Sequence, residues 1–527
     1  MTAYSKVHEF RNSKSFAWYL FCMLGSSIVI AMAIIWPSTS LISLFFMIIF
    51  LTVYLKPMVG VYLLTLLYPI QSICFQLNLR WPWPIKIYVV EILDIILLMV
   101  LILKYLSNYH LWDSNRCYKK PYHDVWIFYF FALFVVWSAF TLLWCDYLEK
   151  GLFSWAQFNS SFVTIAFLIT YLDSYDKFIR LMAFYCCVAA VFALMAICAT
   201  YHAFLVEPVL LVNSKLSILG QVGLRNEGAK FIPQIVGMRT GLGLCSKHEL
   251  VILLSSSVLF SVYLIKHYKS SLIRTLLVIL ILLYETIFYQ AFSRVAMAGT
   301  FFATGFICLA VPFLRKWTFI VMTSLIGLNL IGYCCSEIIK PAHMKSMEST
   351  MERVKAVSSK SEFKQSSYAQ RVRIWRETIE RIQRSKGMGN GPGSLFEDST
   401  FFPPHGHNIV LTLAAEYGIP GAAIIILTLF FIAKRAYNSV FVKPRGESNL
   451  WLLQVVFVAA VLCALFEYSF DLFVYYQHLW YVIGLLLASL KVKLADSPND
   501  QLSFYTPKSL VSPKRNKLFI ESRATSQ

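Results

Sequence analysis

Charged residues are scarce in this sequence. They make up 14% of the 527 residues, whereas hydrophobic residues make up 58% and aromatic residues 16%. A chain so poor in charge does not fit the composition of a water-soluble globular protein. The composition predicts a polytopic membrane protein.

Metal-binding and disulfide patterns are also missing. The twelve cysteines have no CxxC or zinc-ligand spacing, and the adjacent pairs Cys186-Cys187 and Cys334-Cys335 suit ordinary disulfides poorly. We interpret the cysteines as small apolar side chains. No cluster of aspartates with metal-ligand spacing occurs outside the apolar runs, so we expect neither a metal ion nor a cofactor. No cleavage-site pattern follows the first apolar run, which we interpret as a retained helix.

Long apolar runs fill most of the chain. A membrane-crossing helix needs about 20 apolar residues, and these runs are continuous rather than short and alternating as in barrel strands. The sequence therefore predicts an all-α polytopic bundle of about 14 transmembrane helices. We place them at 17–36, 40–55, 57–75, 88–106, 125–144, 151–171, 178–203, 243–265, 272–290, 295–314, 317–334, 407–432, 450–470 and 473–491.

Lys and Arg residues are unequally divided between the connections. When the N-terminus is placed inside, most of them fall in inner connections, and the short outer turns hold only Arg80, Lys86, Lys150 and Arg294. This bias accounts for most of the formal net charge of +19, so we do not expect a nucleic-acid partner. The predicted organisation is an inner N-terminus at 1–16, helices over 17–334 with an outer loop near 204–242, an outer loop at 335–406, helices over 407–491, and a basic, disordered inner tail at 492–527.

The outer loop at 335–406 is basic and partly helical in this prediction. It holds twelve Lys and Arg residues against eight Asp and Glu residues. Apolar side chains recur at helical spacing, which predicts an amphipathic helix along the membrane surface, at Tyr368, Val372, Trp375, Ile379 and Ile382. Arg371 lies one turn before Trp375, so its guanidinium can rest on the indole and present its fork to an anion. A solvated basic surface is the alternative.

Two short motifs follow the predicted helix. A glycine-rich run over 387–393 includes Gly389 and Gly391, which would let the backbone approach a ligand closely, although such runs are most often turns. His405 and His407 then precede Asn408 at the outer lip of the next apolar run. An imidazole titrates near neutral pH and can act as a general base, so His407 is a candidate catalytic residue and His405 a candidate assistant. A histidine that merely fixes the helix at the interface is the alternative.

These motifs, in this order and spacing, resemble the O-antigen ligase and polymerase superfamily. The resemblance covers about 239–421 and rests on Arg239-x-Gly241-x3-Ser246-Lys247-His248-Glu249-Leu250, Ser293-Arg294, Arg371-x3-Trp375, Gly389-Asn390-Gly391-Pro392-Gly393-x2-Phe396 and His407-Asn408-x2-Leu411-x4-Glu416-Tyr417-Gly418-Ile419-Pro420-Gly421. The chain differs from that family where His248 replaces the more usual asparagine, and in having more than about twelve predicted spans.

The resemblance implies a metal-independent, inverting glycosyltransferase in a bacterial inner membrane, with its active site in a periplasmic loop and both termini in the cytoplasm. Its fold would be that of the lipid-dependent glycosyltransferases. The expected donor is a glycan on undecaprenyl pyrophosphate, and the acceptor is lipid A–core or a growing glycan. An O-antigen ligase is the first prediction, an O-antigen or exopolysaccharide polymerase the second. A transporter or flippase is less favoured, because no internal repeat is found.

The residues fall into three predicted roles. The general base is His407, and the leaving diphosphate would be stabilised by Arg371 and Arg294, because guanidinium forks fit phosphate oxygens. The substrate-binding candidates are Arg239, Arg373, Trp375, Gly389, Gly391, Asn408 and His405. Carboxylates within apolar runs are also functional candidates. They are Glu91, Asp94, Glu249, Glu285, Glu416, Glu467 and Asp471; the pairs Glu91/Asp94 and Glu467/Asp471 could each hold an arginine, and Glu416 lies on the helix face opposite His407.

Overall fold

The protein is described from a computed structural model. The described residues are 37–70, 74–77, 85–109, 125–146, 148–201, 247–290, 294–335, 367–397, 408–442, 449–470 and 477–492. The predicted loop near 204–242, most of the predicted tail, and the candidate residues Arg239, His405 and His407 lie outside them.

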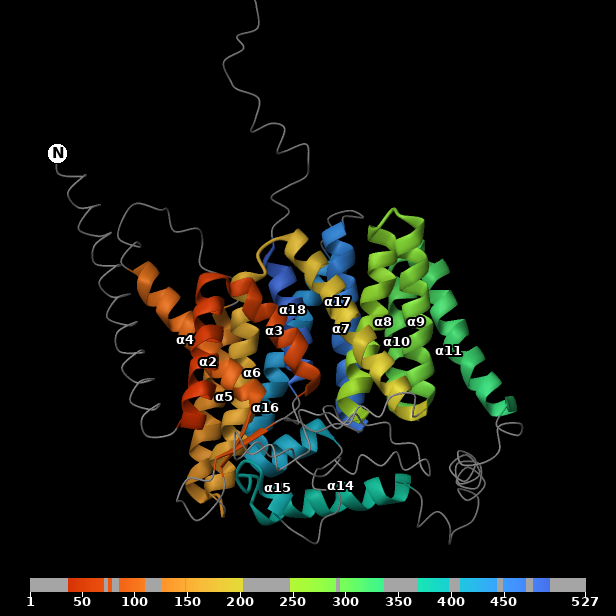
Figure 1. The fold of residues 1–527 in the computed structure, drawn as a ribbon. Helices are drawn as coiled ribbons and strands as arrows, with labels where there is room; N and C mark the ends of the chain where they lie inside the picture. The colour runs from red at the N-terminus through yellow and green to blue at the C-terminus, as the bar shows by residue number, and fades with distance from the viewer. Residues whose placement is uncertain are drawn as a thin grey trace, which may run out of the picture. The chain divides into compact units, whose positions relative to one another are not determined.

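Helices account for almost all of the described chain (Figure 1). Continuous apolar sequence favours helices, because a helix satisfies its own backbone hydrogen bonds where water is absent. The long helices are α2 (Pro37–Leu55), α3 (Pro57–Leu67), α4 (Val89–Tyr109), α5 (Val125–Phe140), α6 (Leu148–Tyr171), α7 (Tyr175–Tyr201), α8 (Lys247–His267), α9 (Ser271–Gln290), α10 (Arg294–Ala310), α11 (Arg315–Cys335), α14 (Ser367–Arg384), α16 (Ile409–Tyr437), α17 (Asn449–Phe470) and α18 (His478–Lys491). The short helix α15 spans Ser394–Glu397.

Every predicted span except 17–36, which lies outside the described residues, coincides with one of these helices. Among the residues described, seven helices are long and apolar enough to cross a membrane, and α2, α3, α10 and α18 contribute shorter apolar stretches. The prediction of a membrane-embedded helical protein is therefore supported, whereas the number fourteen stays a prediction. The predicted span at 57–75 is helical only to Leu67, followed by a 3-10 turn over Tyr68–Ile70.

One antiparallel pair of strands interrupts the helical pattern. Strand β1 (Cys74–Leu77) pairs with β2 (Ile85–Tyr88), and Phe75 lies opposite Ile87. The sequence analysis did not predict this pair. Strand β2 leads directly into α4, which begins at Val89.

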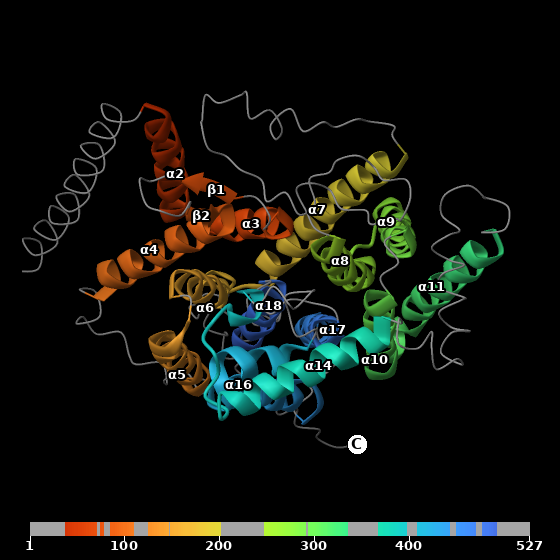
Figure 2. The ribbon, with the colours of Figure 1, turned by 90° about the horizontal axis from the view of Figure 1, so that it is seen from below.

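The helices pack in two groups that share α17 and α18. Helix α18 packs on α6, and α16 packs on α5, while α8 and α10 pack on α17. Aromatic rings fill the first group: Tyr417 of α16 lies between Phe134 and Phe158, with ring centroids 5.2 and 5.5 Å apart, and Phe158 meets Trp480 at 5.5 Å. Helix α14 lies across one end of these helices rather than parallel to them (Figures 1 and 2).

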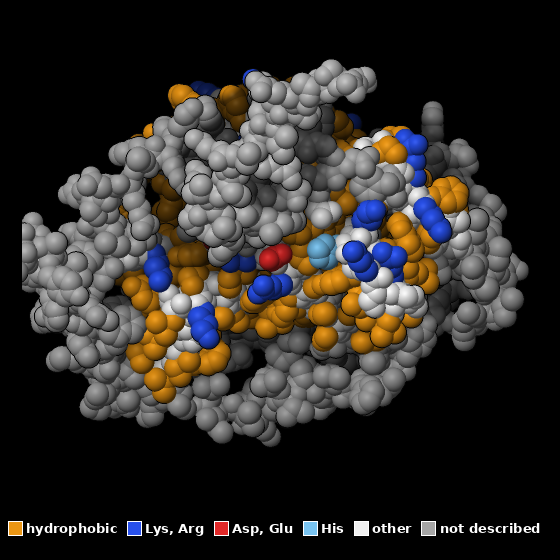
Figure 3. Space-filling model, turned by 90° about the horizontal axis from the view of Figure 1, so that it is seen from above, with side chains coloured by type: hydrophobic (Ala, Val, Ile, Leu, Met, Phe, Trp, Pro, Cys, Tyr) orange, Lys and Arg blue, Asp and Glu red, His pale blue; other side chains and the backbone are white. Residues whose placement is uncertain are grey.

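The end of the helices opposite α14 displays Lys and Arg side chains with few acids (Figure 3). Several of these cations donate hydrogen bonds to carbonyl groups at helix C-termini, where the backbone has no internal donor and the helix dipole is negative. The bonds are Lys177 Nζ to Tyr171 O (3.1 Å), Lys491 Nζ to Ile169 O (3.0 Å), Arg274 Nε to Tyr268 O (2.7 Å), Arg315 Nε to Cys308 O (3.2 Å) and Arg435 Nη2 to Leu490 O (3.3 Å).

Candidate functional site

Helix α14 confirms the amphipathic helix predicted from residue spacing. It ends at Arg384 in a turn in which Gly387 N donates to Ile382 O at 2.9 Å and Lys386 takes a φ of +51°. The face that packs on the protein centres on Ile374 and Thr378, which are 4% and 0% exposed. This face is rotated from the predicted apolar stripe, because Ile379 remains 43% exposed.

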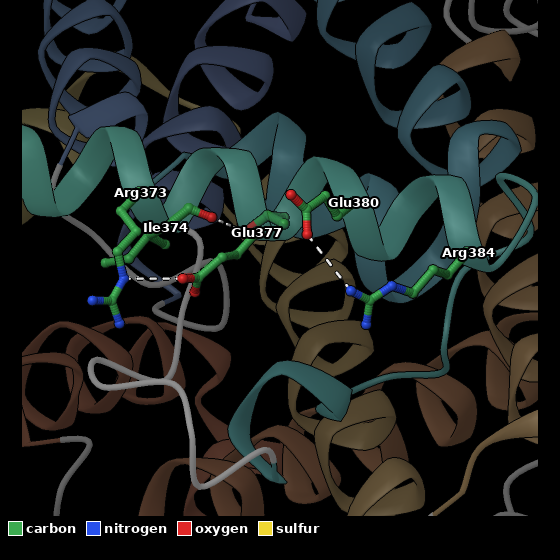
Figure 4. A network of polar contacts seen from close by, with 6 residues as sticks. Arg373, Ile374, Glu377, Glu380 and Arg384 are labelled. Carbon is green, nitrogen blue, oxygen red and sulfur yellow. Dashed lines mark hydrogen bonds and ion pairs between the residues drawn. The ribbon is translucent and has the colours of Figure 1, made fainter.

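The predicted phosphate-binding side chains of α14 occupy different environments. Arg371 and Trp375 are both half-buried, one turn apart, at the edge of the packed face. Arg373 projects from the exposed face and donates from Nε to Glu377 Oε1 at 2.9 Å (Figure 4). Arg384 makes a similar exposed ion pair with Glu380 at 3.6 Å. Of these arginines on α14, Arg371 is half-buried, whereas Arg373 and Arg384 are exposed.

Helix α16 begins at the predicted catalytic motif. Asn408 is its N-cap, and the Oδ1 atom accepts hydrogen bonds from Val410 N at 3.0 Å and Leu411 N at 3.1 Å. Capping explains an asparagine at this position without a ligand. The same cap fixes the start of α16 at Asn408.

Helix α16 is broken near its first third. Gly418 has φ +76° and ψ 171°, values outside the helical region, and Pro420 has no N–H group to donate to Glu416 O. A break of this kind in an apolar segment exposes backbone groups that must find other partners. We refer to residues 418–420 as the α16 break.

The glycine-rich run 387–393, here called the glycine loop, supplies those partners. Ala415 O accepts from Asn390 N at 2.9 Å, Glu416 O accepts from Gly391 N at 3.0 Å, and Ile419 N donates to Gly387 O at 2.8 Å. The side chain of Asn390 also donates to Ala415 O at 3.1 Å. The loop and the broken helix therefore complete each other's backbone hydrogen bonding. We call the two together the junction.

Glycine is required at the junction because the two backbones touch. Gly389 and Gly391 have φ values of +84° and +90°. A Cβ atom at Gly389 would collide with the backbone of Glu416 and Gly418, and one at Gly391 would lie 2.6 Å from Cys145 Cβ. The close approach that the sequence suggested is thus made to the protein's own chain. Binding of substrate by Gly389 and Gly391 stays a prediction.

Two tryptophans from the first half of the chain also bond to the junction. Trp144 Nε1 donates to Gly389 O at 3.1 Å, and Trp137 Nε1 donates to Tyr417 O at 2.7 Å. Trp137 belongs to α5 and Trp144 to the 3-10 turn Thr141–Trp144 that follows it. Sequence reasoning found no motif in this region, because the partners are 245 and 280 residues away.

Arg294 is the first residue of α10, and His407 precedes α16 in the sequence, so we compare the starts of these two helices with α14. The N-terminal end of α14 lies beneath α10, which begins at Arg294, and α16 begins at this same end of the bundle (Figures 1 and 2). The backbone therefore places the start of α10, the start of α16 and the whole of α14 at one end. His407 directly precedes the described start of α16, whereas the side chains of Arg294, His405, His407 and Arg239 lie outside the described part.

Among the predicted intramembrane carboxylates, the structure gives hydrogen-bond partners for Asp94 and Glu467, and Asp471 lies outside the described residues. Asp94 accepts hydrogen bonds from Thr164 Oγ1 at 3.0 Å and Gln477 Nε2 at 2.9 Å, both neutral donors, and makes no ion pair with an arginine within the described ranges. Glu467 accepts from Ser255 Oγ at 2.9 Å. Glu416 is fully buried at the break. Asp94 thus joins α4 to the start of α18 instead of holding a guanidinium.

Among the side chains that the structure describes, no group of three or more His, Cys, Asp and Glu residues could hold a metal ion. Helix α14 carries five arginines and two glutamates, and Glu377 and Glu380 pair with Arg373 and Arg384.

Comparison with known proteins gives one family. Residues 275–426 match the family model described as O-antigen ligase. The matched segment runs from α9 through α10, α11, α14 and α15 and ends in α16 beyond the break. A search of curated proteins gives no match. The resemblance to the O-antigen ligase and polymerase superfamily is thus confirmed over this segment.

Proposed function

We propose, on the premise of this family match, that the protein is an integral-membrane glycosyltransferase of the O-antigen ligase type. It would move a glycan from undecaprenyl pyrophosphate to a sugar hydroxyl of lipid A–core. The observation that carries the proposal is α14, an arginine-bearing helix placed across the bundle end at which α10 and α16 begin. That end would lie in the periplasm, and the Lys- and Arg-rich end in the cytoplasm of an inner membrane.

The proposed reaction assigns one role to each group. His407 removes the proton from the acceptor hydroxyl, and the resulting oxygen attacks the anomeric carbon of the donor sugar. The bond from that carbon to the pyrophosphate oxygen breaks with inversion, and undecaprenyl pyrophosphate leaves with the electron pair. Arg371 and Arg294 stabilise the charge that grows on the diphosphate. In this scheme guanidinium groups serve the function for which other transferases use a divalent ion.

The other candidates have supporting positions. Trp375 lies one turn from Arg371 and would hold its guanidinium or the donor sugar. Arg373 and Arg239 would attract the diphosphate from the periphery, and Asn408 and His405 would contact the acceptor near His407. A polymerase that extends the glycan on its lipid uses the same chemistry, and the family match supports either reaction.

The test is the surface glycolipid profile of a deletion strain on a gel. A ligase predicts bare core with lipid-linked polymer accumulating, whereas a polymerase predicts core that carries a single repeat. The strain is then complemented with wild type and with His407→Ala. We expect His407→Ala to be inserted normally but inactive. Full complementation by His407→Ala would remove this residue from the mechanism, and an unchanged profile in the deletion strain would refute the proposed function.

A further inference from the structure

We propose that Trp137 and Trp144 are positioning residues for glycan transfer. They would hold the glycine loop against the α16 break and so set the geometry of the arginine helix relative to the start of α16. This inference rests on the proposed function, and it gives α5 and its 3-10 turn, which lie outside the matched segment, a part in the reaction.

Each indole bonds to a different segment of the junction. Trp144 donates to the loop carbonyl of Gly389, and Trp137 donates to the helix carbonyl of Tyr417, directly before the break. Their rings lie 6.5 Å apart in an edge-to-face arrangement. The corner formed by α5 and its 3-10 turn therefore bonds to both the glycine loop and α16.

Further close contacts join this corner and α6 to the glycine loop and α16. The Sγ atom of Cys145 lies 3.9 Å from Pro392 O, and a Cβ atom at Gly393 would collide with the side chain of Ser154 on α6. On the helix side, a Cβ atom at Gly421 would lie 3.1 Å from the Trp137 ring. Glycine thus stands at three of the points where this part of the protein approaches the loop and α16, namely Gly391, Gly393 and Gly421.

The junction is the point from which the proposed catalytic groups extend. Helix α14 leads to it from Arg371, and α16 leads back from it to Asn408 and His407. Arg371 is 13 residues before the end of α14, so a rigid helix holds it about 20 Å from the junction. A tilt of about 5° at the junction would move that end by about 2 Å, and a displacement of about 1 Å can slow a reaction 100-fold.

The two hydrogen bonds matter more here than at an ordinary helix contact. The carbonyl of Tyr417 lies next to a residue with non-helical backbone, and Gly389 lies in a loop of alternating positive φ values. Neither segment is held by a continuous helical ladder. The two external donors therefore add to the hydrogen bonds that Asn390, Gly391 and Ile419 make within the junction.

The experiment compares three substitutions of tryptophan by phenylalanine in the full-length protein in lipid nanodiscs. Trp144→Phe and Trp137→Phe each remove an indole N–H while keeping an aromatic ring. Trp155→Phe is the matched control, because Trp155 Nε1 donates to Ser138 Oγ at 3.0 Å within the α5–α6 pair and not to the junction. Hydrogen exchange is measured over 387–393 and 415–421, and kcat and KM are measured with a lipid-linked glycan donor.

Loss of one such bond should speed exchange of the Asn390, Gly391 and Ile419 amides roughly three- to tenfold. We expect kcat to fall by at least the same factor, with KM for the donor unchanged, in Trp144→Phe and Trp137→Phe. Trp155→Phe should change neither quantity. Trp144 is 37% exposed, so its substitution leaves the packed core in place and serves if Trp137→Phe fails to fold.

Three outcomes would overturn the inference. Unchanged exchange in both variants would show that the indoles do not hold the junction. Faster exchange with unchanged kcat would show that the junction is held without consequence for transfer. Equal losses in Trp155→Phe would show a general effect of the α5–α6 pair. A wild-type protein that transfers no glycan refutes the proposed function instead, and the exchange comparison still decides whether the tryptophans fix the junction.

Discussion

Replacement of Gly389 by alanine should open the junction while leaving the helical bundle intact. Gly389 has φ +84°, a conformation that an L-residue adopts at a cost of roughly 1–2 kcal/mol. Its new Cβ atom would also meet the backbone of Glu416 and Gly418, which cannot rotate away as a side chain can. Overpacking of this kind typically costs about 1–3 kcal/mol.

These costs match the strength of the junction itself. The loop is held by the bonds of Asn390, Gly391 and Ile419 and by that of Trp144, each contributing about 0.5–1.5 kcal/mol. A strain of about 2–5 kcal/mol is therefore enough to release the loop. It acts on the loop backbone and should leave in place the ring contact of Phe134 on α5 with Phe158 on α6.

Limited trypsin digestion measures this release, because Arg384 and Lys386 are exposed directly before the glycine loop. Cleavage there should be faster in Gly389→Ala, and transfer activity should fall at least tenfold, while the amount of inserted protein is unchanged. The matched control is Gly305→Ala in α10, where a Cβ atom meets nothing within 4 Å. Equal cleavage rates and equal activities in the two variants would refute the reasoning.

The remaining predictions concern the arginines and the buried carboxylate. Arg371→Lys should lose most transfer activity despite its unchanged charge, because an ammonium cannot make the bidentate contact, and wild-type turnover would count against this role. Arg373→Lys should retain most activity in the same assay, because Arg373 is exposed and ion-paired with Glu377. Asp94→Ala should lower the free energy of unfolding in detergent by about 1–3 kcal/mol, because it leaves the buried donors of Thr164 and Gln477 without their acceptor. Asp94→Asn keeps one acceptor oxygen and should be destabilised less. Equal melting temperatures for both Asp94 variants and wild type would contradict that assignment.

Much of the helical organisation follows from the sequence, because continuous apolar runs in lipid leave the backbone little choice. The amphipathic period of α14 likewise gave the helix correctly. The period did not predict which face is packed. Ile379 is apolar and was placed on that face, but it remains 43% exposed.

The junction could not be predicted for a different reason. Gly389 and Gly391 signal close backbone approach, and that signal is the same whether the approaching group is a ligand or another part of the chain. The partners Trp137 and Trp144 lie far away in sequence and in a region without motifs. The sequence analysis placed an unbroken span at 407–432, because Gly418 and Pro420 stand within a continuous apolar run. The break and the groups that complete the broken helix appear only in the tertiary structure.

The cations that cap helix ends opposite α14 have two tasks at once. Arg315 and Lys177 complete the last turns of α10 and α6, and in the proposed topology their charge would also retain these connections in the cytoplasm during insertion. Engineering that neutralises such residues to reverse the topology would therefore fray the same helices. Exchanges of Lys for Arg, or cations added at neighbouring exposed positions, separate the orienting effect from the capping effect.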